Sequence, residues 1–175
     1  MLSSMEKTPI QIKGMIENWF NKADLEFENL TDSLKPKSPK LEWILLLADT
    51  VAIYMLNGRD DRINVENPIT FTKNHQDALE KLDKENFLDF VNSLNEPSII
   101  AGISTIFRAE NQRIYELKLT DYIDSDELTR GKLFHTIDRL AYMKAHLITK
   151  VQTKLDLESA SLSENYDKSN KAMYG

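Results

Sequence analysis

The sequence predicts an all-α fold: a single-domain bundle of five or six helices with a long basic C-terminal helix. Two observations support this prediction. Apolar residues recur at helical spacing along most of the 175-residue chain. The most apolar run, LEWILLLADTVAIYML, is apolar on nearly every side, which is typical of a helix buried at the centre of a bundle. The composition, 41% hydrophobic and 29% charged, is that of a globular protein.

The first helix is expected at about residues 9 to 34. Thr8 can cap this helix, Pro9 suits its first position, and Gln11 completes a capping box. The apolar positions that follow at helical spacing are Ile12, Ile16, Trp19, Ala23, Phe27, Leu30 and Leu34. The apolar run then predicts a second helix, at about residues 40 to 57.

The stretch from Asn57 to Thr70 is expected to be irregular, because Pro68 and several acids disfavour a strand. A helical pattern begins again at Thr72, and Asp83 can divide it into two helices by capping the second one.

Residues 98–120 allow two interpretations. Their β-branched side chains could form a hairpin. Their apolar side chains, however, cluster within about 120° at helical spacing. The segment also holds no Asn-Gly or Asp-Gly turn, and the sequence NEPS before it resembles a helix entry. We therefore expect a helix here, followed by a last long helix at about 126 to 157 that Asp124 or Ser125 caps.

Residues 1–157 are expected to form the helical bundle domain, and residues 158–175 a mobile polar tail. The chain contains no cysteine, which is compatible with a reducing compartment. The N-terminus lacks the apolar core of a signal peptide, and no apolar run reaches the roughly 20 residues that span a bilayer. We expect a cytoplasmic protein that does not contact membranes.

No motif predicts catalysis, a cofactor or a metal site. The sequence contains neither G-x-G-x-x-G nor G-K-[ST]. His135 and His146 would lie about 16 Å apart on a straight helix, too far to share a metal ion. His135 could form an acid–base pair with Asp138, but a solvated polar face is the commoner explanation. Asp60 and Asp61 could hold a divalent cation, although a surface turn is the favoured interpretation.

Two charged residues occur among apolar neighbours. Asp49 interrupts the apolar run, so we expect it to pair with a basic side chain from another helix. Lys144 projects into the apolar side of the last helix. Either its stem reaches the edge of that side, or a polar partner meets it there.

A basic stripe along the last helix is the strongest functional signal. Residues 128–155 hold six Lys or Arg and one acid, whereas the whole chain carries a net charge of -6. The basic residues lie within an arc of about 100° and span about 33 Å along the helix axis. They are Lys132, His135, Arg139, His146, Lys150 and Lys154.

The stripe has a structural and a functional interpretation. In the structural one it balances acids on neighbouring helices, such as Glu26, Glu28 and Asp32. In the functional one it neutralises a row of nucleic-acid phosphates without reading the base sequence. A stacking aromatic beside the stripe, with Tyr142 as the candidate, would favour nucleic acid, and a large exposed apolar patch would favour a protein partner.

With Lys132, Arg139, Lys150 and Lys154 on one long helix and no cysteine or catalytic motif, the chain resembles the helical small subunits of CRISPR Cascade-type effector complexes. The resemblance is architectural and implies a subunit without an active site that holds nucleic-acid backbone within a larger assembly. We therefore predict a non-catalytic subunit that contacts other subunits and nucleic-acid backbone. The alternative is an adaptor or inhibitor that docks on an acidic protein, and an enzyme using Asp60, Asp61 or His135 comes third.

Overall fold

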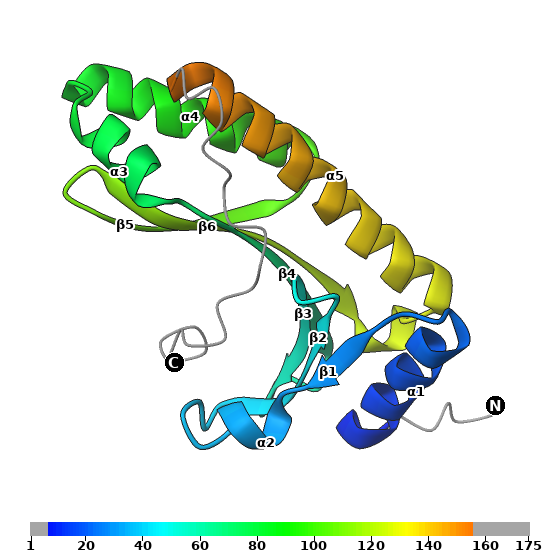
Figure 1. Cartoon of the computed structure of the whole chain (residues 1–175). Helices are drawn as coiled ribbons and strands as arrows, with labels where there is room; N and C mark the ends of the chain where they lie inside the picture. The colour runs from blue at the N-terminus through cyan, green and yellow to red at the C-terminus, as the bar shows by residue number, and fades with distance from the viewer. Residues whose placement is uncertain (1–6, 156–175) are drawn as a thin grey trace. The chain divides into compact units, whose positions relative to one another are not determined.

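The computed structural model describes residues 7–155 and contradicts the all-α bundle of five or six helices. Within these residues, six strands form one sheet in the order β1-β2-β3-β4-β6-β5, and five α-helices accompany it, so the fold is α/β (Figure 1). The elements are α1 (Pro9–Lys22), β1 (Phe27–Asn29), α2 (Thr31–Leu34), β2 (Leu41–Leu47), β3 (Val51–Leu56), β4 (Arg62–Thr70), α3 (Lys73–Glu80), α4 (Lys84–Ile100), β5 (Ser104–Glu110), β6 (Arg113–Asp124), a 3₁₀ helix (Ser125–Glu127) and α5 (Arg130–Leu155).

The described residues divide into two compact units. Unit 1 contains residues 7–65 and 122–137, and unit 2 contains residues 66–121 and 138–155. The sequence of β4, β6 and α5 therefore contributes to both units. The expected tail, 158–175, lies outside the described residues.

The predicted start of α1 is confirmed, but its predicted end is wrong. Thr8 and Gln11 form the capping box: the Thr8 N–H donates to Gln11 Oε1 at 2.9 Å, and the Gln11 N–H donates to Thr8 Oγ1 at 3.3 Å. The helix ends at Lys22, and Asp24 follows with a positive φ of 54°. A left-handed residue turns the chain, so Phe27 lies in β1 instead of continuing the helix.

The predicted helix 40–57 is a hairpin of β2 and β3. Trp43 pairs with Met55 and Leu45 with Ile53. A strand buried on both faces is as continuously apolar as a buried helix, so periodicity does not separate the two. The turn also lacks glycine: Ala48 and Asp49 adopt positive φ values of 46° and 55°.

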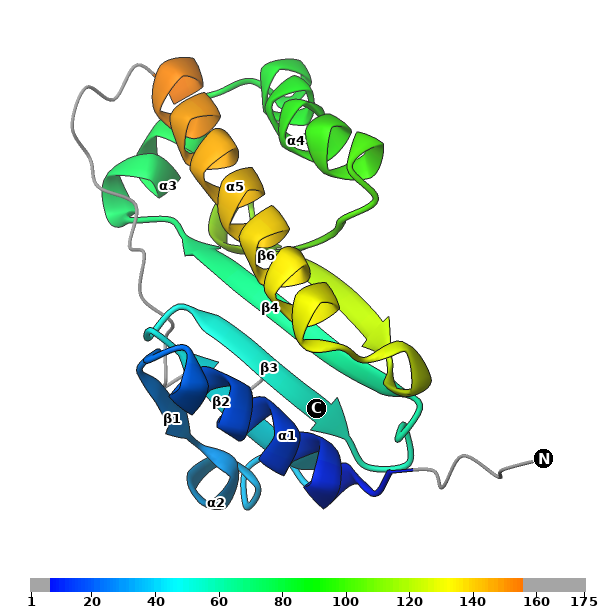
Figure 2. The same cartoon turned by 90° about the vertical axis from the view of Figure 1, so that its right-hand side faces the viewer.

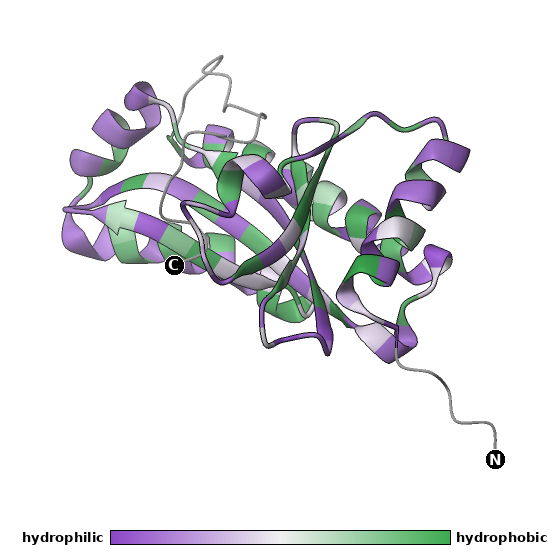
Figure 3. Cartoon of the chain, turned by 90° about the horizontal axis from the view of Figure 1, so that it is seen from below, coloured by the Kyte–Doolittle hydropathy of each residue, from purple (hydrophilic) through white to green (hydrophobic). Residues whose placement is uncertain are grey.

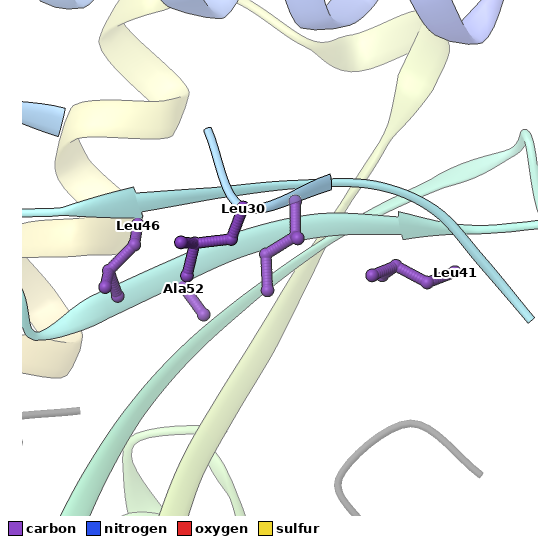
Figure 4. Close-up of a cluster of buried hydrophobic side chains, with 5 residues drawn as sticks. Leu30, Leu41, Leu46 and Ala52 are labelled. Atoms are coloured by element: carbon purple, nitrogen blue, oxygen red, sulfur yellow. The ribbon is translucent and has the colours of Figure 1, made fainter. Parts of the chain in front are cut away.

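Both faces of the β2–β3 hairpin are covered, which explains its unbroken apolar sequence. On one face, Ile44 and Leu46 pack with Ala52 and with Leu30, which precedes α2 (Figure 4). Helix α1 also contacts β2 and buries Ile12, Ile16 and Phe20. The strands thus form the centre of unit 1.

The β2–β3 turn gives the first testable prediction. A side chain in the left-handed region is strained, and glycine removes that strain. We expect Ala48→Gly to raise the free energy of unfolding by about 0.5–1 kcal/mol, measured by urea denaturation. The matched substitution Ala101→Gly, at a right-handed helix C-cap with φ of -79°, should not stabilise the protein. Equal effects would contradict a strained turn.

Unit 2 confirms the predicted helix division at Asp83. Its Oδ1 accepts from the Asn86 N–H at 2.8 Å and caps α4. The helix entry expected at NEPS is wrong, because α4 continues through this sequence and contains Pro97. Figures 1 and 2 show α3, α4 and the unit 2 part of α5 on the same side of β5 and β6.

The helix expected at 98–120 is also wrong, because most of this segment forms the β5–β6 hairpin. Asn111 and Gln112 make its turn with positive φ values of 49° and 61°. Asn tolerates this conformation well, so a hairpin does not require Asn-Gly. The irregular stretch expected before Thr70 likewise contains strand β4.

The last helix is confirmed as α5, with a different cap. The Thr129 hydroxyl accepts from the Lys132 N–H at 3.1 Å, whereas Asp124 and Ser125 belong to β6 and the 3₁₀ helix. Figure 3 shows that the helices carry both hydrophilic and hydrophobic residues. No helix within residues 7–155 is both long and apolar enough to cross a membrane.

Candidate functional site

One outward face of α5 in unit 2 is the candidate site. Its residues recur every four positions, which places neighbours about 40° apart around the helix. We call this set the α5 face: Tyr142, His146, Lys150 and Lys154. In the same helix segment, Leu140, Met143, Leu147 and Val151 are buried. Tyr142, His146 and Lys154 are exposed, and Lys150 is partly exposed.

The α5 face combines an exposed aromatic ring with two lysines. Tyr142 is 77% exposed, more than any other aromatic residue within residues 7–155. Within residues 7–155, Lys150 and Lys154 form no ion pair. The hydroxyls of Thr149 and Thr153 donate to carbonyls of their own helix.

The other members of the predicted stripe divide between the two units. In unit 1, Lys132 pairs with Glu127, and this hydrogen bond raises the pKa of Lys132 and lowers that of Glu127. His135 is exposed. In unit 2, Arg139 pairs with Asp121, whose side chain is largely buried. Lys132 and Arg139 are therefore balanced within the chain, as in the structural interpretation, but their partners lie in the 3₁₀ helix and β6, not on neighbouring α-helices.

A second exposed face in unit 2 lies on α4 and is acidic and apolar. We call it the α4 face: Glu85, Leu88, Asp89, Asn92, Glu96, Ile99 and Ile100. At 100° per residue these positions fall within about 120°. Ile99 and Ile100 are 71% and 80% exposed. A shallow hollow of about 420 Å³ lies on its C-terminal part, lined by Asn92, Asn95, Glu96, Ile99 and Ile100.

Unit 2 also buries charged side chains. Lys144 Nζ donates to Asn67 Oδ1 at 3.1 Å, so a polar partner meets it on the apolar side of α5. Glu66 and Lys118 form an ion pair at 3.3 Å, and Glu116 is buried as well. Single charges within a strand carry no signal of burial, so the sequence does not reveal that Glu66, Lys118 and Glu116 are buried.

The model of a family described as an uncharacterized conserved protein, DUF2299, matches residues 12–151. The chain belongs to this family. An uncharacterized protein from Methanothermobacter thermautotrophicus has a similar fold, with a TM-score of 0.71 and 17% sequence identity over 82% of this chain and 99% of that one. YbjN, a putative transcription regulator from E. coli, gives a TM-score of 0.44 and 8% identity over 89% and 98%. No curated protein matches the chain.

The DUF2299 match and the similar structure establish family and fold and do not concern CRISPR effector complexes or nucleic acid. The resemblance to CRISPR small subunits rested on an all-helical architecture. The six-stranded sheet contradicts that architecture, so the resemblance loses its basis.

Other residues that the sequence highlighted lie in turns of this DUF2299 chain. Asp49 is exposed in the β2–β3 turn, not within an apolar helix. Asp60 and Asp61 lie between β3 and β4, where the Asp61 carboxylate is 3.7 Å from Arg62 Nε. In the described part of the chain, no group of three or more His, Cys, Asp or Glu is placed to hold a metal ion.

His75, at the start of α3, predicts a pH dependence of stability. It is fully buried, its Nδ1 lies 2.6 Å from Thr72 Oγ1, and burial lowers its pKa below 6.5. The unfolded chain therefore binds this proton more readily. The stability that neutral His75 contributes should be complete above about pH 6.5 and decline as the pH falls toward the lower, folded-state pKa.

We expect urea titrations at a series of pH values to show this decline, and His75→Gln to reduce it. His135→Gln, at an exposed histidine, is the matched control and should leave the decline unchanged. A wild-type pH profile that His75→Gln does not alter would contradict the prediction.

Proposed function

We propose that this protein is a non-catalytic adaptor that docks on an acidic partner protein through the α5 face. The observation that carries the proposal is the exposed Tyr142 on one helix with two lysines, about 12 and 18 Å along the axis, that form no ion pair within residues 7–155. Aromatic side chains with a polar tip are enriched at the energetic centres of protein interfaces. Lysines elsewhere on the same face favour an acidic partner and speed association.

Charge favours a protein over nucleic acid as the partner. Lys132 and Arg139 already pair with acids, which removes two expected phosphate contacts. The described residues of unit 2, 66–121 and 138–155, hold eleven acids and ten Lys or Arg, so unit 2 does not present the broadly basic surface that phosphate binding favours. Contact between the whole basic stripe and a nucleic-acid backbone remains a prediction. The proposal places the contact in the cytoplasm, since the chain has no cysteine.

Site-specific photo-crosslinking tests this function. A benzophenone amino acid replaces Tyr142 in the full chain, and the chain is irradiated inside cells. We expect a protein crosslink that survives nuclease treatment and is lost in Lys150→Glu/Lys154→Glu. The same photo-reactive residue at Ile10, also exposed but on α1, is the control. Nuclease-sensitive products, or equal yields from both positions, would contradict a protein-docking role for the α5 face.

A further inference from the structure

The α4 face has the chemistry that the α5 face requires of a partner. It presents three acids and no base, together with the apolar side chains of Leu88, Ile99 and Ile100. Exposed apolar side chains grouped on one face are typical of interaction surfaces. Each chain therefore carries both an acidic apolar face and a basic aromatic face, on two helices of the same unit.

The spacing of charges on the two faces also matches. Lys150 and Lys154 lie four residues apart, as do Glu85 and Asp89, so each pair spans about 6 Å of helix. With the helices antiparallel, Lys154 meets Glu85 and Lys150 meets Asp89. A parallel arrangement with Lys150 beside Glu85 and Lys154 beside Asp89 also forms both pairs, but it places Tyr142 about 12 Å before Glu85, outside α4, which begins at Lys84.

The same antiparallel register brings the aromatic ring to the apolar end of α4. Tyr142 lies about 18 Å from Lys154 along its helix, and Ile99 lies about 21 Å from Glu85. Glu96 lies about 16 Å from Glu85 along α4. It therefore comes near the Tyr142 hydroxyl of the other copy and can accept its hydrogen bond. One register thus satisfies the two lysines, the tyrosine and the exposed isoleucine.

We propose that the acidic partner is a second copy of this chain, and that the α5 face of each copy packs antiparallel on the α4 face of the other. The inference rests on the proposed function and names its partner. Helices α4 and α5 run in roughly opposite directions on the same side of β5 and β6 (Figures 1 and 2). A two-fold axis parallel to these helices places α4 of each copy on α5 of the other copy. The same contact then forms twice, as a symmetric dimer requires. Pairing α4 with α4 would bring acids together without a base.

A charge-swap experiment on the full chain tests this dimer. Sedimentation equilibrium should give twice the 20.2 kDa chain mass for the wild type. Lys150→Glu/Lys154→Glu and Glu85→Lys/Asp89→Lys should each raise the dimer dissociation constant by at least about tenfold, because like charges then face each other. An equimolar mixture of the two variants should form a one-to-one heterodimer, because both contacts again join opposite charges.

Lys22→Glu/Lys40→Glu is the matched control, with the same change in net charge at two exposed lysines of unit 1. It should dimerise as the wild type does, and circular dichroism should show that every variant is folded. A wild-type mass equal to one chain at all concentrations, or no heterodimer in the mixture, would overturn the second-copy proposal. If a nuclease-resistant crosslink from Tyr142 then joins another acidic protein, the adaptor function stands and only the partner assignment fails.

Discussion

Lys118→Met is expected to destabilise the protein by about 3–5 kcal/mol, measured by urea denaturation. Lys118 Nζ lies 3.3 Å from Glu66 Oε1, and the Glu66 side chain is only 3% exposed. Methionine fills a similar volume without the charge, so the loss isolates the electrostatic contribution. The Glu66 carboxylate then stays buried without this cation, and its desolvation is no longer offset.

Glu66→Met/Lys118→Met is the control for this prediction. It removes both charges and keeps the volume, so the double variant should lose less stability than Lys118→Met alone. Lys132→Met, at an exposed lysine that also pairs with an acid, should change stability little. A double variant less stable than Lys118→Met would show that the pair does not act through mutual charge compensation.

Phe20→Ala is the second substitution with a large expected effect, also a loss of about 3–5 kcal/mol. Phe20 is fully buried on α1, and its ring centroid lies 5.6 Å from that of Phe27 and 6.0 Å from that of Phe134. Alanine leaves a cavity and removes both aromatic contacts. Thermal and urea unfolding of the variant measure the loss.

Ile10→Ala tests whether the effect of Phe20→Ala reflects burial. Ile10 lies on the same helix and is 75% exposed, so its truncation should change stability by less than about 0.5 kcal/mol. Similar losses for the two variants would mean that α1 does not present Phe20 to the core as described.

Sequence reasoning succeeded where a signal is local. The capping box at Thr8, the cap at Asp83 and the amphipathic pattern of α5 each lie within a few residues of one another, and all three are confirmed. It failed for the β2–β3 and β5–β6 hairpins. Their turns place Ala48 and Asn111 at positive φ without glycine, and β2 and β3 are too uniformly apolar to show a period of two.

The candidate site was recognised only in part. Charge segregation and helical spacing identified the residues of the α5 face, because both properties can be read along one helix. The pairing of Lys132 with Glu127 and of Arg139 with Asp121 had to come from the fold. The α4 face was not recognised at all, since helical spacing alone does not show which apolar residues of a helix remain exposed.

The sequence by itself determined the starts of α1 and α4 and the helical, basic character of α5, because capping and periodicity act over a few residues. The tertiary structure alone decided that the apolar run is two strands, that Glu66 pairs with Lys118, and that Ile99 and Ile100 are exposed. Each of these depends on which segments meet in space. Burial and charge pairing are properties of those contacts, so residues distant in the chain decide them together.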